Sequence, residues 1–403
     1  MGDTAKLKKA IAILAYNNAE YFCQVLDAVL EQTIDGQPID QHYDIFIYQD
    51  GLQQRHAQAS LVHYERIAQY AEQKLGHQHF FRQASNIGIG LQFAFVEQDL
   101  FINRQYDFVT FLEHDYVVGP QYFEVLTKLA MLFEADERIA AVSANSSQYR
   151  ARLEQQIAHQ NELIVMEHDW GAGVFRRAWE KRLPVMNAYY RLLQGSAFED
   201  RPNLLIQSWM SSLGFYPGST SQDTIKACVD SALGQVRIST YPNFGRYIGA
   251  QGMHWNQEIY EQHGYDKTVI FSEKYTLPIM LSAQSLNQLL VQQKSSFLEK
   301  AESFDELAFL DRIARDDLDF VGLANLKVSH LTHEDVKAAY LIFLGRLPRD
   351  QDEIDNLLGK SGDDALSYFL LSDEFTSRSV IVPIIFNCAK KILDKQQSVA
   401  TKI

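Results

Sequence analysis

The stretch that most constrains this chain is residues 106–120, YDFVTFLEHDYVVGP. Its first part is a run of β-branched and aromatic residues, which predicts a strand over 108–112 that is buried on both faces. The run ends abruptly in Glu113, His114 and Asp115. In an open α/β sheet, ligands bind outside the carboxyl ends of the strands. Two carboxylates and a histidine there could hold a divalent cation, or they could simply end the strand in solvent.

The segments on either side alternate between strand and helix patterns. Apolar runs predict strands, and apolar residues at helical spacing predict the helices between them. The predicted strands cover 10–16, 43–48, 79–82, 108–112, 139–143 and 236–240. The predicted helices cover 20–31, 54–75, 86–100, 122–134 and 225–233. This alternation predicts βαβ units in a mostly parallel, doubly wound sheet, which is an α/β fold.

Polar residues with useful chemistry follow each of the first three predicted strands. Tyr16 and Asn17 follow the first strand, Asp50 follows the second, and Asn86 and Gly88 follow the third. In a doubly wound sheet, these strand ends share one edge with the Glu-His-Asp triplet. A carboxylate there could accept a hydrogen bond from a ribose hydroxyl or a base N–H. A glycine at a helix start lets the backbone approach a ligand closely.

From about residue 165 the sequence is punctuated by glycine. Trp170, Gly171 and Gly173 follow an apolar segment, and the glycines suggest a wall where a ligand lies against the backbone. Residues 194–220 mix glycine, serine, proline and aromatic side chains, which predicts a long loop serving as a lid or acceptor surface. A second Glu-His-Asp triplet at 167–169 is either another metal site or a chance repeat of common polar residues.

Helical patterns without strands dominate the end of the chain. Residues 284–319 are charged and helical in pattern, and residues 332–378 carry apolar side chains at helical intervals. We therefore predict a first domain over 1–325 and a small all-α domain over 326–403. Within the first domain, the two halves of the sheet region cover about 8–145 and 146–275, and a helical connector covers about 284–325.

Charge and cysteine usage exclude some classes of function and location. A net charge of −14 leaves no basic footprint for nucleic acid. The three cysteines, Cys23, Cys228 and Cys388, form no disulfide framework, which favours a reducing cytoplasm. No stretch approaches the roughly 20 apolar residues of a membrane helix. The apolar segment 380–388 precedes two lysines, which is consistent with a packed terminal helix or with peripheral contact at the inner membrane.

The order of these motifs resembles the GT-A nucleotide-sugar glycosyltransferases. Within them it is similar to the α-mannoside β-1,2-N-acetylglucosaminyltransferase (GlcNAc-transferase I) type and its bacterial relatives. The resemblance covers about 8–275 and rests on Gln49-Asp50-Gly51, Glu113-His114-Asp115, the strand 140–145, Gly171-Ala172-Gly173, Gln222-Asp223-Thr224 and the pair Arg246 and Gly252. His114 replaces the middle acid of the family's triplet, and the tryptophans that flank the family's catalytic-helix acid are missing beside Asp223.

The resemblance implies inverting transfer of a sugar from a UDP-sugar donor to a hydroxyl of a glycan or glycoconjugate. It implies a GT-A domain whose donor half is 8–145 and whose acceptor half is 146–275. Asp115 would bind Mn²⁺ or Mg²⁺, and His254 is either a nitrogen ligand or an ordinary histidine. Asp223 would be the base, with Glu199 and Asp200 in reserve. The implied donor-binding residues are Tyr16, Asn17, Asp50, Arg82, Asn86, Gly88, Glu113 and His114; the implied acceptor-binding residues are Trp170, Gly171 and Gly173.

Two other functions deserve comparison, and the sequence argues against the second. The altered triplet and the missing tryptophans are consistent with a catalytically silent carbohydrate- or partner-binding protein on the same scaffold. A nucleotidyltransferase would place a glycine-rich basic loop after the first strand, where this chain has Asn-Asn-Ala-Glu at 17–20. Residues 340–348 and 371–375 resemble a small helical bacterial domain of unknown function. That likeness implies a bacterial source and a domain that docks an acceptor, a protein or a membrane surface.

Overall fold

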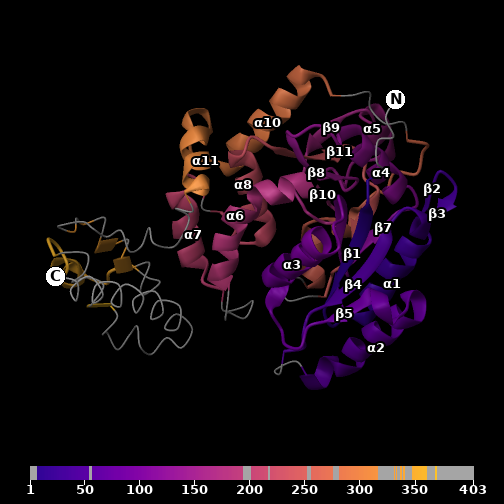
Figure 1. The fold of residues 1–403 in the computed structure, drawn as a ribbon, viewed down its shortest axis with the longest axis horizontal. Helices are drawn as coiled ribbons and strands as arrows, with labels where there is room; N and C mark the ends of the chain where they lie inside the picture. The colour runs from indigo at the N-terminus through magenta and orange to yellow at the C-terminus, as the bar shows by residue number, and fades with distance from the viewer. Residues whose placement is uncertain are drawn as a thin grey trace.

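The computed structural model describes residues 7–53, 57–193, 201–216, 218–251, 256–275, 281–315 and 347–360, with single positions between 331 and 369. Within these residues, eight strands form one sheet in the order β5-β4-β1-β6-β10-β8-β11-β9. Figure 1 shows helix α3 on one side of β1 and β4, and α1 and α2 on the other side. No helix in the described part of the chain is both long and apolar enough to cross a membrane.

The strands of the main sheet are β1 (Lys9–Ala15), β4 (Asp44–Gln49), β5 (Phe80–Arg82), β6 (Phe108–Glu113), β8 (Ile139–Ser143), β9 (Leu163–Val165), β10 (Gly173–Phe175) and β11 (Val236–Thr240). Two small sheets pair β2 (Thr33–Ile34) with β3 (Gln37–Pro38), and β7 (Tyr116–Val118) with β12 (Gly245–Tyr247). The helices are α1 (Ala19–Leu30), α2 (Ala57–Leu75), α3 (Gly88–Gln98), α4 (Tyr122–Phe133), α5 (Leu153–Ala158), α6 (Arg176–Leu193), α7 (Asn203–Ser212), α8 (Gln222–Ala232), α9 (Gln257–Gln262), α10 (Ala283–Phe297), α11 (Glu306–Ala314) and α13 (Gln351–Asp355).

The sheet is mostly parallel, which confirms the predicted α/β fold class. β1 runs parallel to β4 and β6, β4 to β5, and β8 to β11. β9 is antiparallel to β11. β10 lies antiparallel between β6 and β8, so a strand from the second half of the domain joins the two halves of the sheet. The prediction missed β10 because three residues that begin with glycine carry no detectable strand period.

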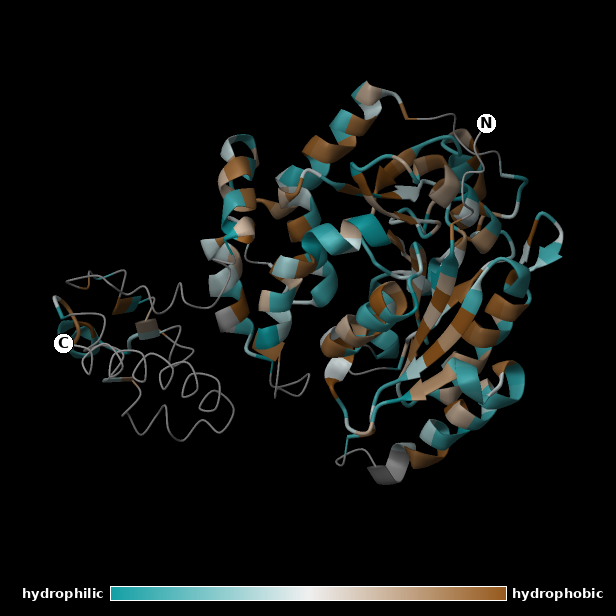
Figure 2. Ribbon diagram, viewed as in Figure 1, coloured by the Kyte–Doolittle hydropathy of each residue, from teal (hydrophilic) through white to brown (hydrophobic). Residues whose placement is uncertain are grey.

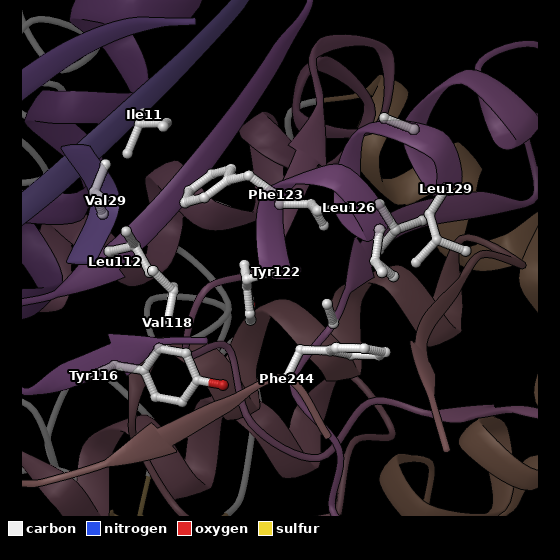
Figure 3. Close-up of a cluster of buried hydrophobic side chains, with 14 of the residues drawn as sticks. Ile11, Val29, Leu112, Tyr116, Val118, Tyr122, Phe123, Leu126, Leu129 and Phe244 are labelled. Carbon is white, nitrogen blue, oxygen red and sulfur yellow. The ribbon is translucent and has the colours of Figure 1, made fainter. Parts of the chain in front are cut away.

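Successive residues of β1 point to opposite faces of the sheet and enter two different cores. Ile11 and Ile13 join the core built with α1, α2 and α4, whereas Ala12 and Leu14 join the core that contains α3 and part of α6. Figure 2 shows the central strands as largely hydrophobic, as burial on both faces requires. Figure 3 shows the first core, where Ile11, Leu112 from β6 and Phe123 from α4 lie together.

The predicted loop over 194–220 is wrong in part, because α7 occupies Asn203–Ser212. The helix forms because Ile206, Trp209 and Met210 are buried in a second cluster, built also from α6 and α8. The connector is two helices, α10 and α11, and the break between them includes Leu298, which bridges to Phe215. The predicted C-terminal domain lies mostly outside the described residues.

Candidate active site

The Glu-His-Asp triplet lies at the corner where β6 ends and β7 begins. The His114 N–H donates to the Leu14 carbonyl at 3.0 Å, which continues the pairing of β1 with β6 past the last strand residue. The Ile248 N–H donates to the Asp115 carbonyl at 2.8 Å, directly after β12 has paired with β7. Backbone bonds therefore fix this corner from both sides before any ligand is bound.

Glu113 feels the charges of two other carboxylates at this corner. The pKa of Glu113 is raised well above its usual range, first by burial and then by the negative charges of Asp115 and Asp223, while Lys226 opposes the shift. Burial also raises the pKa of Asp115, and His114 opposes that rise. The charge of Asp223, the predicted base, therefore acts on Glu113, the first acid of the triplet.

The Asp115 carboxylate is suited to hold a cation. Its Oδ1 atom is buried and has no hydrogen-bond partner within the described structure. A buried carboxylate oxygen without a partner is unfavourable unless a cation or donor reaches it. Among the described residues, no three His, Cys, Asp or Glu side chains form a complete metal-binding group. Asp115 therefore fits a site whose remaining ligands come from the substrate or from the rest of the chain; His254 lies outside the described residues.

Asp50 organises the predicted donor side through its own hydrogen bonds. Its carboxylate accepts the N–H groups of Gly51 at 2.8 Å, Ile87 at 2.9 Å and Gly88 at 2.9 Å. It also accepts the Asn86 side-chain amide at 2.9 Å. Gly88 has a φ of +76°, which glycine adopts without strain. Asp50 thus ties the loop before α3 to the end of β4, and direct contact of Asp50 with a donor stays a prediction.

The other predicted donor residues lie at the same edge of the sheet and bond to their neighbours. The Tyr16 hydroxyl accepts the Gln53 N–H at 3.3 Å. The Asn17 amide donates to Ser60 of α2 at 3.1 Å. Arg82 forms an ion pair with Glu65 of α2 at 3.0 Å. Each residue therefore sits where the sequence places it, and its role toward a nucleotide stays a prediction.

Gly171 and Gly173 are explained by packing. Gly171 has a φ of +72°, and a Cβ added there would lie 2.0 Å from the Tyr122 hydroxyl oxygen. A Cβ on Gly173 would lie 2.0 Å from Cζ of the Phe108 ring. Close packing against these two rings requires glycine, whatever ligand lies nearby, and the acceptor role of both residues stays a prediction.

Replacing Gly173 by alanine is expected to destabilise the protein by about 1–3 kcal/mol, because the new methyl group overlaps the Phe108 ring in a packed core. Urea unfolding followed by circular dichroism measures this change. Gly218→Ala is the matched control, since a Cβ there meets nothing within 4 Å. Equal unfolding midpoints for the two variants would show that the core accommodates the methyl group.

Trp170 lies inside a stack of rings. The Tyr247 ring lies 4.4 Å from it at an interplanar angle of 7°. The His168 ring lies 4.5 Å from it at 15°. Protein rings therefore cover the indole, and its predicted contact with an acceptor stays a prediction.

The second Glu-His-Asp triplet divides among separate partners. His168 stacks on Trp170, and Asp169 pairs with the buried guanidinium of Arg237. Glu167 is exposed. The three side chains do not converge, which favours a chance repeat over a second metal site.

Helix α8 carries a charged stripe that the sequence analysis missed. Asp223, Lys226 and Asp230 follow one another at helical spacing, and the last two are fully buried. Lys226 pairs with Glu97 of α3 at 2.7 Å, and Asp230 with Arg182 of α6 at 3.3 Å. The sequence signal that could have shown this stripe is the spacing of the charged residues at i, i+3 and i+7 among the apolar residues of the same helix.

The buried charges hold α8 in place beside the triplet. Arg182 also pairs with Glu97 at 3.2 Å, so one guanidinium joins α3, α6 and α8. Burial raises the pKa of Asp230 to about 6, although Arg182 and Lys226 oppose the rise. This buried network fixes the helix that carries Asp223.

Asp223 lies in the first turn of α8, and Ser221 occupies the N-cap position. The predicted helix begins three residues later than α8, and Asp223 lies inside the observed helix. A carboxylate in the first turn is favoured by the helix dipole. The side chain of Asp223 is half-buried, which leaves it accessible to a substrate. The reserve candidates Glu199 and Asp200 lie outside the described residues.

Residues 3–174 match the model of the GNT-I family. The matched segment contains the triplet corner, the Asp50 loop and the strands from β1 to the start of β10. This match agrees with the motif resemblance, and it supports an enzyme of the GT-A nucleotide-sugar glycosyltransferase kind. No curated protein is a significant match to the chain.

Solved structures of glycosyltransferases show only weak likeness. A mannosyltransferase from Pyrobaculum calidifontis, in complex with GDP-Man and Mn²⁺, is 11% identical with a TM-score of 0.39, over 97% of this chain and 89% of that chain. TarS 1–349 from S. aureus is 11% identical with a TM-score of 0.36, and the match covers 87% of this chain and 83% of that chain. GalNAc-T7 with UDP, GalNAc and Mn²⁺ is 10% identical with a TM-score of 0.37, and the match covers 78% of this chain and 58% of that chain. Likeness at this level carries no argument about the substrate of this chain.

Proposed function

We propose that this chain is a metal-dependent, inverting glycosyltransferase. It would transfer GlcNAc or a related hexose from a UDP-sugar to a hydroxyl of a glycan or glycoconjugate. The observation that carries the proposal is the buried, unpartnered Oδ1 of Asp115, at a strand end inside the segment that matches the GNT-I family. The charges of Asp115 and Asp223 both act on Glu113, which supports one reaction centre for the three carboxylates.

Asp115 is the residue proposed to hold Mn²⁺ or Mg²⁺, because both ions prefer oxygen ligands. When bound, such an ion neutralises the charge that develops on the leaving diphosphate. The donor-binding residues proposed at the same edge are those that end or follow β1, β4 and β5, together with Glu113 and His114, and Glu113 is proposed to lie toward the sugar. Their shared sheet edge supports this assignment.

Asp223 is the proposed general base. An inverting displacement needs one carboxylate within hydrogen-bond reach of the acceptor hydroxyl, which loses its proton as the new glycosidic bond forms. Asp223 accepts that proton in this proposal. Its half-buried position in the first turn of α8 leaves its side chain partly accessible, as a base for an acceptor hydroxyl must be.

A silent binding protein on the same scaffold is the second candidate. The specific observation that favours it is that no three metal-ligating side chains come together within the described residues. Isothermal titration calorimetry with UDP and Mn²⁺ separates the two candidates. Loss of UDP binding when Mn²⁺ is chelated supports the enzyme, and failure to bind UDP at all favours the silent scaffold.

The proposed function predicts UDP release from a UDP-sugar, dependent on Mn²⁺ or Mg²⁺. Asp115→Asn should lower this activity by about 100-fold or more, because it removes the charge that binds the ion. A panel of UDP-sugars, assayed for UDP release with and without EDTA, measures both effects. The exposed Asp40→Asn variant is the control and should keep full activity. Full activity in Asp115→Asn would show that the metal assignment is wrong.

A further inference from the structure

We propose that Tyr247 is a positioning residue that orients the Asp115 carboxylate for the cation, and that Trp170 holds Tyr247 in that role. This inference rests on the proposed function, because it takes Asp115 as the metal ligand. Tyr247 and Trp170 would not touch the ion or the substrate in this role. Their effect would pass through the direction in which one carboxylate points.

The two oxygens of Asp115 have different surroundings. Oδ1 is buried without a partner within the described structure, and the Tyr247 hydroxyl hydrogen-bonds the carboxylate. The acceptor of that bond is therefore Oδ2. A phenol carries an O–H donor and a carboxylate offers only acceptor oxygens, so the Tyr247 hydroxyl is the donor. This bond leaves Oδ1 as the oxygen available to a cation.

The backbone at Gly249 packs against both groups. A Cβ built on Gly249 would lie 2.2 Å from the Tyr247 hydroxyl oxygen and 2.6 Å from Asp115 Oδ2. Only a residue without a side chain lets the chain pass this close to the pair. The turn after β12 thus limits where the hydroxyl and the carboxylate can move.

The pairing of β12 with β7 brings Tyr247 to Asp115. Tyr247 is the register partner of Tyr116, the residue that follows Asp115 in the chain. The Ile248 N–H then donates to the Asp115 carbonyl at 2.8 Å. Backbone hydrogen bonds therefore hold Asp115 and Tyr247 close together, independently of the contact between their side chains.

Trp170 fixes the ring that carries the hydroxyl. The Trp170 and Tyr247 rings stack with centroids 4.4 Å apart and an interplanar angle of 7°. The His168 ring also stacks on Trp170, with centroids 4.5 Å apart. Tyr265 contacts Tyr247 edge-on, with ring centroids 5.2 Å apart. A stacked ring of this kind has little freedom to rotate. The loop before β10 is thereby linked to the proposed metal ligand through one aromatic contact.

Residues that orient a metal ligand through hydrogen bonds change metal affinity by about 10- to 100-fold when they are lost. Tyr247→Phe should therefore raise the Kd for Mn²⁺ by about 10-fold or more, because it removes the hydroxyl and keeps the ring. Trp170→Leu should raise it as well, although Trp170 does not contact Asp115. Trp170→Phe, which keeps an aromatic stack, should restore most of the affinity.

The experiment titrates Mn²⁺ into the full chain with a fixed concentration of UDP and follows free Mn²⁺ by electron paramagnetic resonance. Tyr265→Phe is the control, since it removes a neighbouring hydroxyl from the same aromatic group and should keep wild-type affinity. Gly249→Ala is a second test, because its methyl group would press on the Tyr247 hydroxyl and the Asp115 carboxylate, and it should also weaken Mn²⁺ binding. Near-ultraviolet circular dichroism checks that each variant is folded.

Asp115→Asn separates this inference from the proposed function. If Asp115→Asn abolishes Mn²⁺ binding while Tyr247→Phe and Gly249→Ala bind as wild type, the metal site stands and the positioning role is overturned. If Asp115→Asn binds Mn²⁺ normally, both proposals are overturned. Weaker binding in Tyr247→Phe and Trp170→Leu, with normal binding in Tyr265→Phe, supports the positioning role.

Discussion

Replacing Asp223 by asparagine is expected to lower kcat by about 100- to 10,000-fold, the usual contribution of a general base. Asparagine keeps the size and first-turn position of the side chain but cannot accept the acceptor's proton. The KM for the UDP-sugar should change little, because the residues proposed to bind the donor lie at the ends of β1, β4 and β5 and not on α8. Steady-state kinetics with a UDP-sugar and an acceptor that supports transfer measure both constants.

Ser221→Ala is the matched control for this prediction. Ser221 occupies the N-cap of the same helix, and its hydroxyl lies 3.0 Å from that of Thr224. Its removal tests whether local disturbance of the helix start is enough to reduce kcat. A similar loss in both variants would count against Asp223 as the base. Unchanged kcat in Asp223→Asn would move the role to another carboxylate, with Glu199 and Asp200 the first to test.

Replacing Arg182 by methionine is expected to destabilise the protein by about 3–5 kcal/mol, the cost of leaving buried charges without their partner. Arg182 is fully buried and pairs with both Glu97 and Asp230. Methionine fills part of the space but leaves Asp230 without its closest cation. Guanidinium or urea unfolding, read as the change in the free energy of unfolding, measures the loss.

Arg176→Met is the control for this prediction, because it removes an arginine from the same helix. Arg176 pairs with Glu180 at the surface, 2.9 Å away, and such exposed pairs contribute under about 1 kcal/mol. The two variants therefore make the same chemical change, and they differ in whether the lost ion pairs are buried or exposed. Equal losses of stability would mean that the Arg182 ion pairs contribute no more than a surface pair.

The sequence predicted the sheet well where apolar runs were long. The strands at 139–143 and 236–240 match β8 and β11 residue for residue, and those at 10–16, 43–48 and 108–112 differ from β1, β4 and β6 by a residue at one or both ends. A buried parallel strand needs a continuous apolar run, and such a run is visible without knowing its neighbours. The rule that parallel strands present their ends at one edge predicted that the triplet lies beside Asp50 and Asn86, whereas Asp223 was implied only by the family resemblance.

The missed features depend on contacts between distant parts of the chain. α7 is stabilised by burial against α6 and α8, which a local pattern cannot show. The charged stripe of α8 looks like a solvent-facing helix surface until Glu97 and Arg182 are placed beside it. Gly171 and Gly173 suggested a ligand wall, whereas the rings of Tyr122 and Phe108 explain why a side chain cannot be there.

The short strand β10 has a consequence for how this protein can be divided. Because β10 lies between β6 and β8, the first half of the domain cannot complete its own sheet. A fragment ending near residue 145 would leave the β6 edge open, and an open strand edge invites pairing with other chains. During synthesis, this edge of β6 cannot pair with β10 until residues 173–175 have been added to the chain. The proposed donor and acceptor halves therefore share one sheet, and we expect that neither half folds without the other.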